Sequence, residues 1–477
     1  MSMGIILAID CGTTSVRVLA FNKSSQLVHT EQQELPLSHP KPDWVEQDPH
    51  TIWTFVEQCL TKTIHTLGVT NIHAIGITNQ RETAVIWQKS TGMPLGPAIN
   101  WQCRRTTKRC RELNEYAPLI KEKTGLPLDP YFSASKFEWL VQTNPNVQAL
   151  LRKNDLCFGT IDTWLLYNLT NKQSYATDAT NASRTMLFNI QTQTYDSELC
   201  DLFQLPIHAL PEVKDSCSYF GDYIIQGISI PIRAILGDQQ AALYAQSSIG
   251  QIKNTYGTGL FMMANTGTSM IKTKDLITTV ASRLNGVVSY AIEGSVFTGG
   301  ALIQWLRDQL NLIETAAETE VIAQRVSDNG GVTIIPALTG LGAPHWLPDA
   351  KGMITGLTRQ SNKSHIIRAA LESIALQSND IITLIKKECP HIAFEELLVD
   401  GGASANNWLM QLQADVSELT VKRPHSIEAT ALGVAKCAAF FDHYWEEVKP
   451  SKMSTFLFKS DQNALKSQWQ SELKKLT

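Results

Sequence analysis

The sequence of 477 residues has no apolar run that approaches the roughly 18 residues a helix needs to span a membrane. Its formal net charge is only -4 with both signs interspersed, so it has no basic stripe for nucleic acid or for an anionic membrane surface. The nine cysteines show no paired spacing, which is typical of free thiols in a reducing compartment. The apolar run Gly4–Ile9 is too short for a secretory signal peptide. We therefore expect a cytoplasmic protein with no nucleic-acid partner and no stable membrane insertion.

Common nucleotide-binding and catalytic motifs are missing as well. The motif G-x-x-x-x-G-K-[ST] does not occur, which excludes a P-loop NTPase, and no G-x-G-x-x-G follows a predicted strand. The paired H-R-D and D-F-G motifs of protein kinases are also absent. The histidines share no metal-ligand spacing. Any nucleotide chemistry in this chain must therefore use another type of phosphate loop.

Short segments that are rich in glycine, hydroxyl and amide residues are present, each beside a predicted strand. They are IDCGTTSVR (Ile9–Arg17), GDQQA (Gly237–Ala241), YGTG (Tyr256–Gly259) and DGGASANN (Asp400–Asn407). Small residues let backbone N–H groups and hydroxyls close around phosphate oxygens. One such loop is weak support, but several together indicate a nucleotide held in a cleft between two halves of the protein.

The hydrophobic pattern predicts an α/β protein of two large domains. We expect strands at Ile5–Ile9, Val16–Phe21, Ile72–Thr78, Ile230–Leu236 and Leu397–Val399, and helices at Ile52–Leu67, Thr106–Tyr116, Ser135–Gln142, Thr298–Leu310 and 365–386. Asn254–Ala264 repeats the glycine–threonine loop and strand of the N-terminus, which suggests an internal duplication. We divide the chain into domains at residues 1–247 and 248–477.

Two aspartates follow predicted strands directly. Asp10 could be an ordinary cap of a strand-to-turn junction, and on its own this interpretation has about equal weight. Asp238 lies at the end of a second strand, where open α/β sheets place their ligands. Two carboxylates beside phosphate loops suit metal-assisted phosphoryl transfer, in which one holds Mg²⁺ and the other accepts the proton of an attacking hydroxyl.

The segment Gln80-Arg81-Glu82-Thr83 also follows a predicted strand. A surface ion pair is the simpler interpretation of Arg81 and Glu82, but guanidinium donors and carboxylate acceptors also match vicinal hydroxyls of a polyol. Trp101 fits a core position and a polyol-binding wall about equally well. Tyr131 and Phe261, taken alone, are more typical of core residues than of ligand contacts.

Together these residues resemble the FGGY carbohydrate kinases of the actin-like ATPase superfamily, over residues 4–440. The resemblance is carried by GITNQRETAVIW (Gly76–Trp87), WQCRRT (Trp101–Thr106), YFSASKFEWLVQT (Tyr131–Thr143), TNASRTMLFN (Thr180–Asn189), GDQQAAL (Gly237–Leu243), NTYGTG (Asn254–Gly259), LTGLGAPHW (Leu338–Trp346) and GMITGLTRQSNKSHIIRAALE (Gly352–Glu372). It implies two ribonuclease-H-like domains with a cleft between them, and assembly as a homodimer or homotetramer.

The resemblance also implies a reaction, the ATP-dependent phosphorylation of glycerol to sn-glycerol 3-phosphate with release of ADP, in glycerol catabolism. Asp238 would be the catalytic base, and Asp10 would lie near Mg²⁺. The implied glycerol-binding residues are Arg81, Glu82, Trp101, Tyr131, Asp238, Gln239 and Phe261. The implied residues for ATP or ADP are Thr13, Thr14, Ser15, Arg17, Thr258, Gly300, Gln304, Gly402 and Asn406.

Three features depart from the family pattern. Cys11 replaces a glutamine, and an exposed thiol there would make activity sensitive to oxidation. Gly221–Ile232 lacks the glycine-rich loop that some bacterial members use for fructose 1,6-bisphosphate, and the tail beyond Phe440 diverges. Two rival functions stay open: another sugar or polyol kinase of the same family, for xylulose or ribulose, and an actin-like nucleotide-dependent scaffold.

Overall fold

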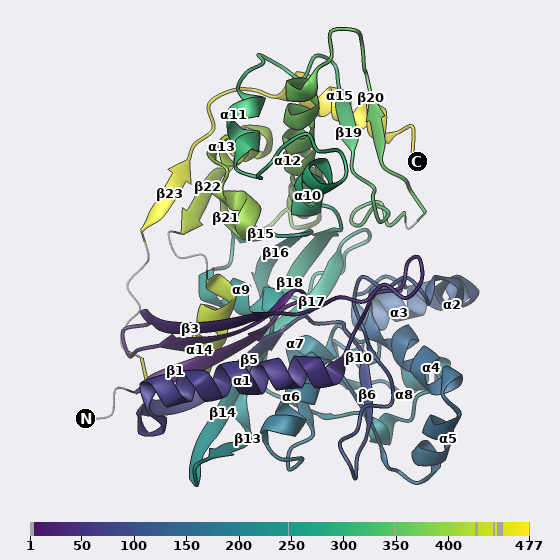
Figure 1. Ribbon diagram of the computed structural model, residues 1–477. Coiled ribbons are helices and arrows are strands. Elements are labelled where there is room, and N and C mark those ends of the chain that lie inside the picture. The colour runs from purple at the N-terminus through teal and green to yellow at the C-terminus, as the bar shows by residue number, and fades with distance from the viewer. Residues whose placement is uncertain are drawn as a thin grey trace. The chain divides into compact units, whose positions relative to one another are not determined.

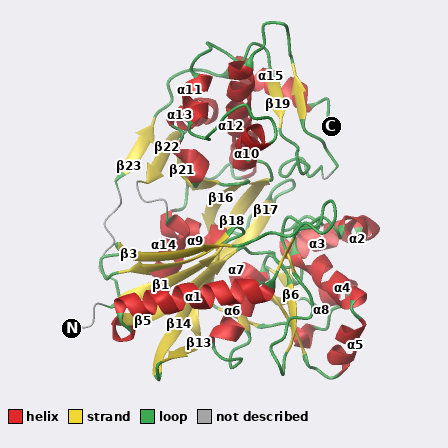
Figure 2. Cartoon of the chain, in the orientation of Figure 1, coloured by secondary structure: helices red, strands yellow, loops and turns green. Residues whose placement is uncertain are grey.

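The computed structural model describes residues 4–246, 248–347, 349–424, 428–441, 444–445 and 452–476. It divides the chain into two compact units of mixed helix and strand (Figures 1 and 2). Unit 1 contains Met1–Gln246, Thr278–Tyr290 and Glu428–Lys449, and unit 2 contains Ser247–Ile277, Ala291–Ile427 and Pro450–Thr477. Two segments beyond residue 247 thus belong to unit 1. Residues 1, 247 and 477, which bound the domains expected from the sequence, lie outside the described residues.

Unit 1 is built around a six-stranded sheet of order β13-β14-β5-β1-β2-β3. The strands between residues 4 and 246 of unit 1, within this sheet and outside it, are β1 (Ile5–Cys11), β2 (Ser15–Phe21), β3 (Leu27–Glu34), β4 (Glu46–Gln47), β5 (Ile72–Asn79), β6 (Val85–Gln88), β7 (Ala98–Ile99), β8 (Leu156–Gly159), β9 (Ala176–Asp178), β10 (Phe188–Asn189), β11 (Thr194–Tyr195), β12 (Glu212–Lys214), β13 (Cys217–Ile225) and β14 (Ile228–Gly237). Its helices are α1 (Pro49–Leu67), α2 (Thr107–Glu112), α3 (Ala117–Thr124), α4 (Ser133–Thr143), α5 (Pro145–Arg152), α6 (Ile161–Leu169), α7 (Ala179–Ala182), α8 (Ser197–Leu202), α9 (Asp238–Gln246) and α14 (Ala429–Phe440). The predicted helix Thr106–Tyr116 is wrong in one respect, because α2 ends at Glu112 and a 3-10 turn, Asn114–Tyr116, follows.

Helices cover both faces of this sheet because Ile5–Ile9 of β1 are apolar on both sides of the strand. Ile5, Leu7 and Ile9 belong to a core cluster that contains residues of α1 and α6. Ile6 and Ala8 belong to a second cluster, which contains residues of α9 and α14. A strand buried on both sides is typical of parallel pairing, and β1 pairs parallel with β5, as β5 does with β14. These three strands therefore end at one edge of the sheet.

Helix α14 comes from a distant part of the sequence and lies very close to α9. An added Cβ at Gly433 would lie 1.8 Å from the carbonyl oxygen of Ala241, and one at Gly76 would lie 2.9 Å from that of Val434. Glycine at these two positions lets α14 approach α9 and β5 more closely than any other residue would. The small side chains of α14, mostly alanine, serve the same close packing.

Unit 2 repeats the strand pattern of unit 1. The seven-stranded sheet has the order β17-β18-β16-β15-β21-β22-β23, in which β17 after its first residue and the first part of β18 fall within Thr278–Tyr290 and are counted in unit 1. The strands are β15 (Gln251–Tyr256), β16 (Leu260–Gly267), β17 (Ile277–Leu284), β18 (Val287–Val296), β19 (Thr333–Ile335), β20 (Met353–Thr355), β21 (Glu396–Asp400), β22 (Thr420–Pro424) and β23 (Met453–Phe456). The order β18-β16-β15-β21-β22 corresponds to β3-β2-β1-β5-β14, with the same antiparallel first pair and parallel central pairs. The predicted internal duplication and the α/β class are therefore confirmed.

The helices of unit 2 are α10 (Gly300–Asp308), α11 (Glu318–Ala323), α12 (Lys363–Glu388), α13 (Asn407–Ser417) and α15 (Asn463–Leu473). The longest, α12, begins with a capping box formed by Asn362 and His365, and its apolar face enters the core of the unit. The last helix, α15, is held on α12 by the indole of Trp469, whose Nε1 donates to Asp380 Oδ2 at 2.7 Å. The divergent C-terminal tail therefore ends in a packed helix of unit 2.

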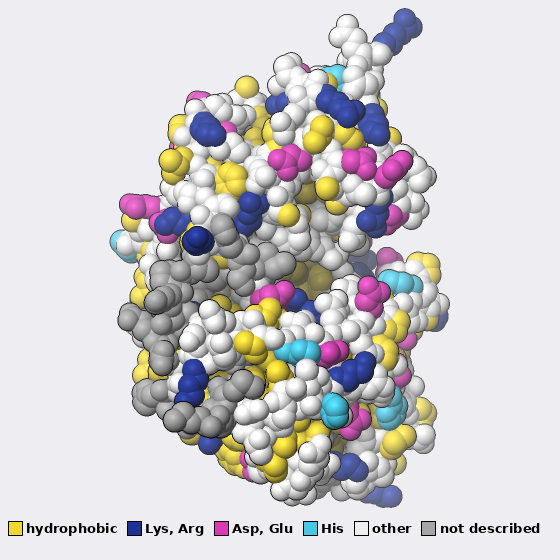
Figure 3. Space-filling model, turned by 60° about the vertical axis from the view of Figure 1, so that its left-hand side comes forward, with side chains coloured by type: hydrophobic (Ala, Val, Ile, Leu, Met, Phe, Trp, Pro, Cys, Tyr) yellow, Lys and Arg dark blue, Asp and Glu magenta, His cyan; other side chains and the backbone are white. Residues whose placement is uncertain are grey.

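Two further observations concern the exterior. Within the described ranges, no helix combines the length and the apolar character that crossing a membrane requires. On the face drawn in Figure 3, basic side chains in blue and acidic side chains in magenta are interspersed. This face agrees with the mixed charge pattern read from the sequence.

Candidate active site

The first candidate loop connects β1 to β2 and is closed by a hydrogen bond from Gly12 N to Ser15 O of 3.0 Å. Asp10, at the end of β1, is buried and accepts a 2.5 Å hydrogen bond from Arg17 Nη2 on the neighbouring strand. The other nitrogen of Arg17, Nη1, donates to Glu428 Oε2 at 2.7 Å. Arg17 is thus held between two carboxylates while 26% of its side chain stays exposed.

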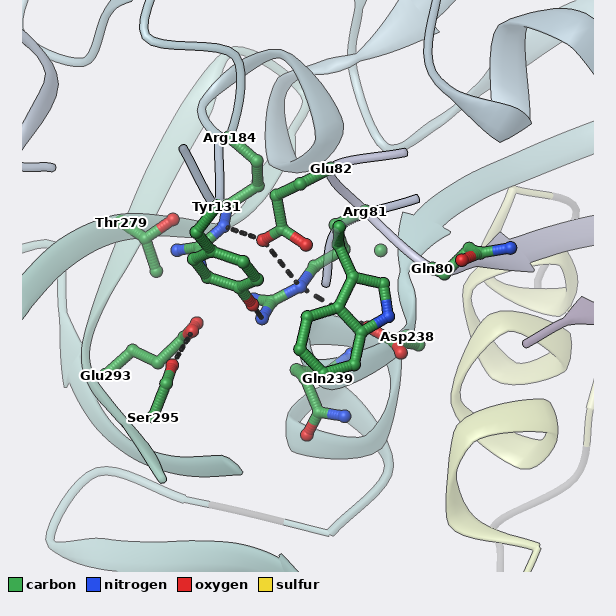
Figure 4. Close-up of polar contacts among 12 residues, drawn as sticks. Gln80, Arg81, Glu82, Tyr131, Arg184, Asp238, Gln239, Thr279, Glu293 and Ser295 are labelled. Carbon is green, nitrogen blue, oxygen red and sulfur yellow. Dashed lines mark hydrogen bonds and ion pairs between the residues drawn. The ribbon is translucent and has the colours of Figure 1, made fainter. Parts of the chain in front are cut away.

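Arg81 is the centre of the second group and is almost fully buried after the end of β5 (Figure 4). Its Nε atom lies 3.5 Å from Glu82 Oε1 and 3.4 Å from Asp238 Oδ1. Nη1 donates to Gln240 Oε1 at 3.2 Å, and Nη2 donates to the hydroxyl of Tyr131 at 3.3 Å. Burial of both side chains excludes the simpler interpretation of Arg81 and Glu82 as a surface ion pair.

Glu82 has a second cationic partner that the sequence motifs did not single out. Arg184 is fully buried and its Nε donates to Glu82 Oε1 at 2.7 Å. A buried lysine, Lys136, donates to the backbone oxygen of Tyr131 at 2.5 Å, and burial lowers its pKa to about 8. The only sequence signal for Arg184 was its place in the segment TNASRTMLFN, Thr180–Asn189.

Asp238 begins α9 at the carboxyl end of β14, and its Oδ1 accepts the backbone N–H of Gln239 at 2.7 Å. Its side chain is 28% exposed, whereas Arg81 beside it is 2% exposed, so the carboxylate has an open side. An added Cβ at Gly237 would lie 2.7 Å from Arg81 Cγ, and glycine there lets the strand end beside the guanidinium.

The pKa of Asp238 is raised to about 6. Burial is the main cause, Arg81 opposes it, and the negative charges of Glu82 and Asp10 raise the pKa further. The carboxylates of Asp10 and Asp238 therefore lie within electrostatic reach of each other, as the sequence-based hypothesis required. A carboxyl group with this pKa changes its charge near neutral pH and can accept a proton.

Two aromatic residues lie between these groups. The rings of Trp101 and Tyr131 meet edge to face with centroids 5.6 Å apart, and 8% of Trp101 is exposed. The indole Nε1 of Trp101 donates to Thr13 Oγ1 at 2.8 Å, which ties the aromatic group to the phosphate loop. Unit 1 thus brings together most of the predicted residues that lie in it: Asp10, Thr13, Arg17, Arg81, Glu82, Trp101, Tyr131, Asp238 and Gln239. Thr14 is an exposed loop residue and Ser15 starts β2.

The remaining predicted residues lie in unit 2. The loop after β15 meets the start of α10, where Gly300 N donates to Gly257 O at 2.8 Å and Ala301 N donates to Thr258 O at 3.1 Å. The loop after β21 begins at Gly401, which has a φ of +85°. An added Cβ there would lie 2.7 Å from Tyr256 O, so the position requires glycine. These contacts bring the loops after β15 and β21 and the N-terminus of α10 together.

The side chains of this group differ in their surroundings. Asn406 caps α13 by accepting from Leu409 N, and its Nδ2 donates to Thr319 Oγ1 at 3.2 Å. Gly402 and Gln304 are exposed, and nothing lies within 4 Å of an added Cβ at Gly402. Phe261 is half-buried on β16.

The expectation of an exposed thiol at Cys11 is wrong. Cys11 is the last residue of β1 and is fully buried. Burial, assisted by the charge of Asp10, raises the pKa of this thiol well above its usual range. A buried thiol that stays protonated is a poor nucleophile, so oxidation at this position is not expected.

Family models and known proteins are similar to this chain over most of its length. Residues 5–245 match the sequence model of the FGGY family of carbohydrate kinases, N-terminal domain, and residues 252–441 match that of its C-terminal domain. A glycerol kinase from Aquifex aeolicus is 47% identical over 448 residues, which are 93% of this chain and 91% of that protein. One from Desulfitobacterium hafniense is 49% identical over 458 residues, 92% of this chain and 91% of that protein.

A solved structure shows the same likeness in three dimensions. The crystal structure of Plasmodium falciparum glycerol kinase with ADP matches with a TM-score of 0.90 and 34% identity, over 99% of this chain and 98% of that chain. This match confirms the two-domain fold class expected from the sequence. The chain belongs to the FGGY family of carbohydrate kinases.

Proposed function

We propose that this protein transfers the terminal phosphoryl group of ATP to glycerol, giving sn-glycerol 3-phosphate and ADP, as a cytoplasmic enzyme that forms homodimers or homotetramers. The names of the relatives at 47% and 49% identity support the substrate. The observation that carries the proposal is the buried Arg81, whose Nε lies near both Glu82 and the partly exposed Asp238. This arrangement offers donors and acceptors for vicinal hydroxyls beside a carboxylate that can take up a proton.

We call the residues assigned to glycerol the polyol group: Arg81, Glu82, Trp101, Tyr131, Asp238, Gln239 and Phe261. Each of them has a distinct task in this proposal. Arg81 donates to one hydroxyl and Glu82 accepts from another, while the hydrogen bond from Arg184 Nε holds Glu82 in its orientation. Trp101 and Tyr131 pack against the three-carbon backbone, and Gln239 supplies an amide. Phe261 is also assigned to the polyol. Asp238 accepts the proton as the hydroxyl oxygen bonds to phosphorus and the bond from phosphorus to ADP breaks.

The loop after β1 holds phosphate oxygens through Thr13, Thr14, Ser15 and Arg17. Asp10 fits a hydrated Mg²⁺, because carboxylate oxygens are the ligands Mg²⁺ prefers and Arg17 engages only its Oδ2. When bound, Mg²⁺ supplies neutralisation of phosphate charge. From unit 2, we assign Thr258, Gly300, Gln304, Gly402 and Asn406 to the nucleotide; the open space around Gly402, where nothing lies within 4 Å of an added Cβ, supports this assignment.

A coupled assay of ADP release tests the substrate. The purified protein is incubated with ATP, Mg²⁺ and one of glycerol, D-xylulose, D-ribulose or no acceptor. We expect turnover with glycerol to exceed turnover with either pentulose at least tenfold. A substrate whose hydroxyls do not match the site leaves the buried Glu82 or Arg81 without a hydrogen-bond partner, which weakens transition-state binding. Faster turnover with a pentulose than with glycerol would instead indicate that the protein is another sugar kinase of the family.

The scaffold alternative is tested by light scattering with ATP, with and without glycerol. Assembly that needs ATP and ignores glycerol, together with no polyol-dependent ADP release, would favour a nucleotide-dependent scaffold. Glycerol-dependent ADP release without assembly would favour the kinase.

The raised pKa of Asp238 predicts how activity depends on pH. Because its pKa is about 6, the carboxyl group is ionised at pH 8 and mostly protonated at pH 5, where it accepts no further proton. We expect kcat/KM for glycerol to fall below pH 6 with a slope of about tenfold per pH unit. Measurement from pH 5 to 8, with circular dichroism as a check of folding, tests this; a flat profile through pH 6 in folded protein would contradict it.

A further inference from the structure

Three buried amide side chains, those of Gln47, Gln80 and Asn100, lie behind the phosphate loop of unit 1. Two of them hold backbone carbonyls of that loop. Gln47 Nε2 donates to Thr13 O at 2.9 Å, and Gln80 Nε2 donates to Gly12 O at 3.2 Å. The loop therefore rests on side chains that are themselves excluded from water.

The three amides also bind one another, which fixes their orientation. Gln80 Nε2 donates to Gln47 Oε1 at 2.8 Å. Asn100 Nδ2 donates to both Gln47 Oε1 and Gln80 Oε1 at 3.0 Å. Because these oxygens each accept from a neighbour while the nitrogens hold the loop, rotating one amide would place like atoms against each other.

Two residues of this amide network are adjacent in the chain to residues of the polyol group. Gln80 directly precedes Arg81, and Figure 4 shows its amide turned away from the Arg81 cluster. Asn100 directly precedes Trp101. Two of the amides are thus the immediate chain neighbours of residues assigned to the polyol.

A closed ring of hydrogen bonds runs through these groups. Thr83 Oγ1 donates to Gln80 Oε1 at 2.8 Å and accepts from Trp101 N at 3.2 Å. Trp101 Nε1 in turn donates to Thr13 Oγ1 at 2.8 Å, and Thr13 O accepts from Gln47. The ring therefore contains both the aromatic wall and the phosphate loop.

We propose that Gln47, Gln80 and Asn100 are positioning residues that couple the polyol group to the phosphate loop through Trp101 and Thr13. This inference rests on the proposed function. The hydroxyl oxygen of Thr13, Oγ1, accepts a hydrogen bond from the indole N–H of Trp101. The hydroxyl hydrogen of Thr13 is therefore directed elsewhere, toward an acceptor such as a phosphate oxygen. A polyol that packs on Trp101 thereby stabilises the loop geometry that grips ATP.

A double-mutant cycle of Gln47→Met and Trp101→Phe tests the coupling. Each variant removes a hydrogen bond to Thr13, one to its carbonyl and one to its hydroxyl. We expect each single variant to lower kcat/KM for ATP about tenfold, since a buried hydrogen bond in a network is lost. The kcat/KM for ATP of the double variant should be little lower than that of the more impaired single variant, because both substitutions break the same ring.

The matched control is Gln33→Met on the edge strand β3, which removes a side-chain hydrogen bond to Gln58 of α1 and should leave all constants unchanged. Independent, multiplying effects of the two variants, or a parent-like kcat/KM for ATP in Gln47→Met, would overturn the inference. If Gln47→Met melts far below the parent, the cycle of Trp101→Phe with Thr13→Val replaces it. Trp101→Phe should then have no further effect on kcat/KM for ATP once the Thr13 hydroxyl is gone.

Failure of the proposed function is recognised separately. If the parent releases no ADP with any polyol of the panel, the kinase assignment fails and the same cycle is measured by calorimetric binding of ADP. Non-additive losses in ADP affinity would still support the coupled network, and additive ones would reject it.

Discussion

Asp238→Asn is expected to lower kcat for glycerol phosphorylation by about 10²- to 10⁴-fold, the usual contribution of a positioned general base. Asparagine keeps the size of the side chain but cannot accept the proton of the attacking hydroxyl. It also removes the negative charge that faces Arg81 Nε at 3.4 Å. Steady-state assays with saturating glycerol and ATP measure the loss.

Binding distinguishes this outcome from unfolding. The variant should keep the melting temperature and the ADP affinity of the parent, because the nucleotide is assigned to other residues. Asp308→Asn, which changes an aspartate exposed on α10, is the matched control and should keep full activity. Turnover of Asp238→Asn near that of the parent would remove the proposed base from the mechanism.

The second large effect is expected from Gly433→Ala. The new Cβ would lie 1.8 Å from the carbonyl oxygen of Ala241 and 2.5 Å from its carbonyl carbon, and backbone atoms cannot rotate out of the way. Helix α14 must shift away from α9, which opens the core cluster on that face of the sheet. We expect a loss of about 3 kcal/mol or more in the free energy of unfolding of unit 1, seen calorimetrically as a Tm lowered by roughly 6 °C or more.

Gly402→Ala serves as the comparison for stability, because an added Cβ there meets nothing within 4 Å and the position has no positive φ. Its Tm should stay near that of the parent. A Gly433→Ala protein with the parent's Tm would mean that α14 and α9 are not packed as closely as described.

The sequence predicted the central strands well because their signals are local. Ile5–Ile9 is a continuous apolar run that ends at Asp10, and Ile72–Thr78 is mostly apolar and is followed by polar residues; β1 and β5 follow these segments closely. Helix 365–386 was predicted from its apolar period and corresponds to α12. The polar residues that follow parallel strands could be assigned to a site for the same reason.

The place of α14 could not be predicted in this way. Its sequence is alanine-rich and apolar on all sides, which indicates burial but not the partner. The contact of Gly433 with Ala241 joins residues far apart in the chain, and no periodicity reports such a distance. The domain division at residue 247 therefore assigned Ala429–Phe440 to the second domain, whereas this helix packs in unit 1.

The charged residues of the candidate site could be predicted from the sequence, but the residues that hold them and the phosphate loop in place could not. Arg81, Glu82 and Asp238 stand in recognisable segments, but Gln47 and Asn100 are amides whose role depends on which carbonyls they meet. Arg184 was missed because a lone arginine is more often a solvated residue than the buried partner of a glutamate.

The late position of α14 has a consequence for biosynthesis. A nascent chain that has emerged as far as residue 427 carries every strand of the first sheet, yet one face of that sheet, with Ile6, Ala8 and Leu19, still lacks its alanine-rich cover. This apolar surface stays open to chaperones or to misassociation until Ala429–Phe440 has been synthesised.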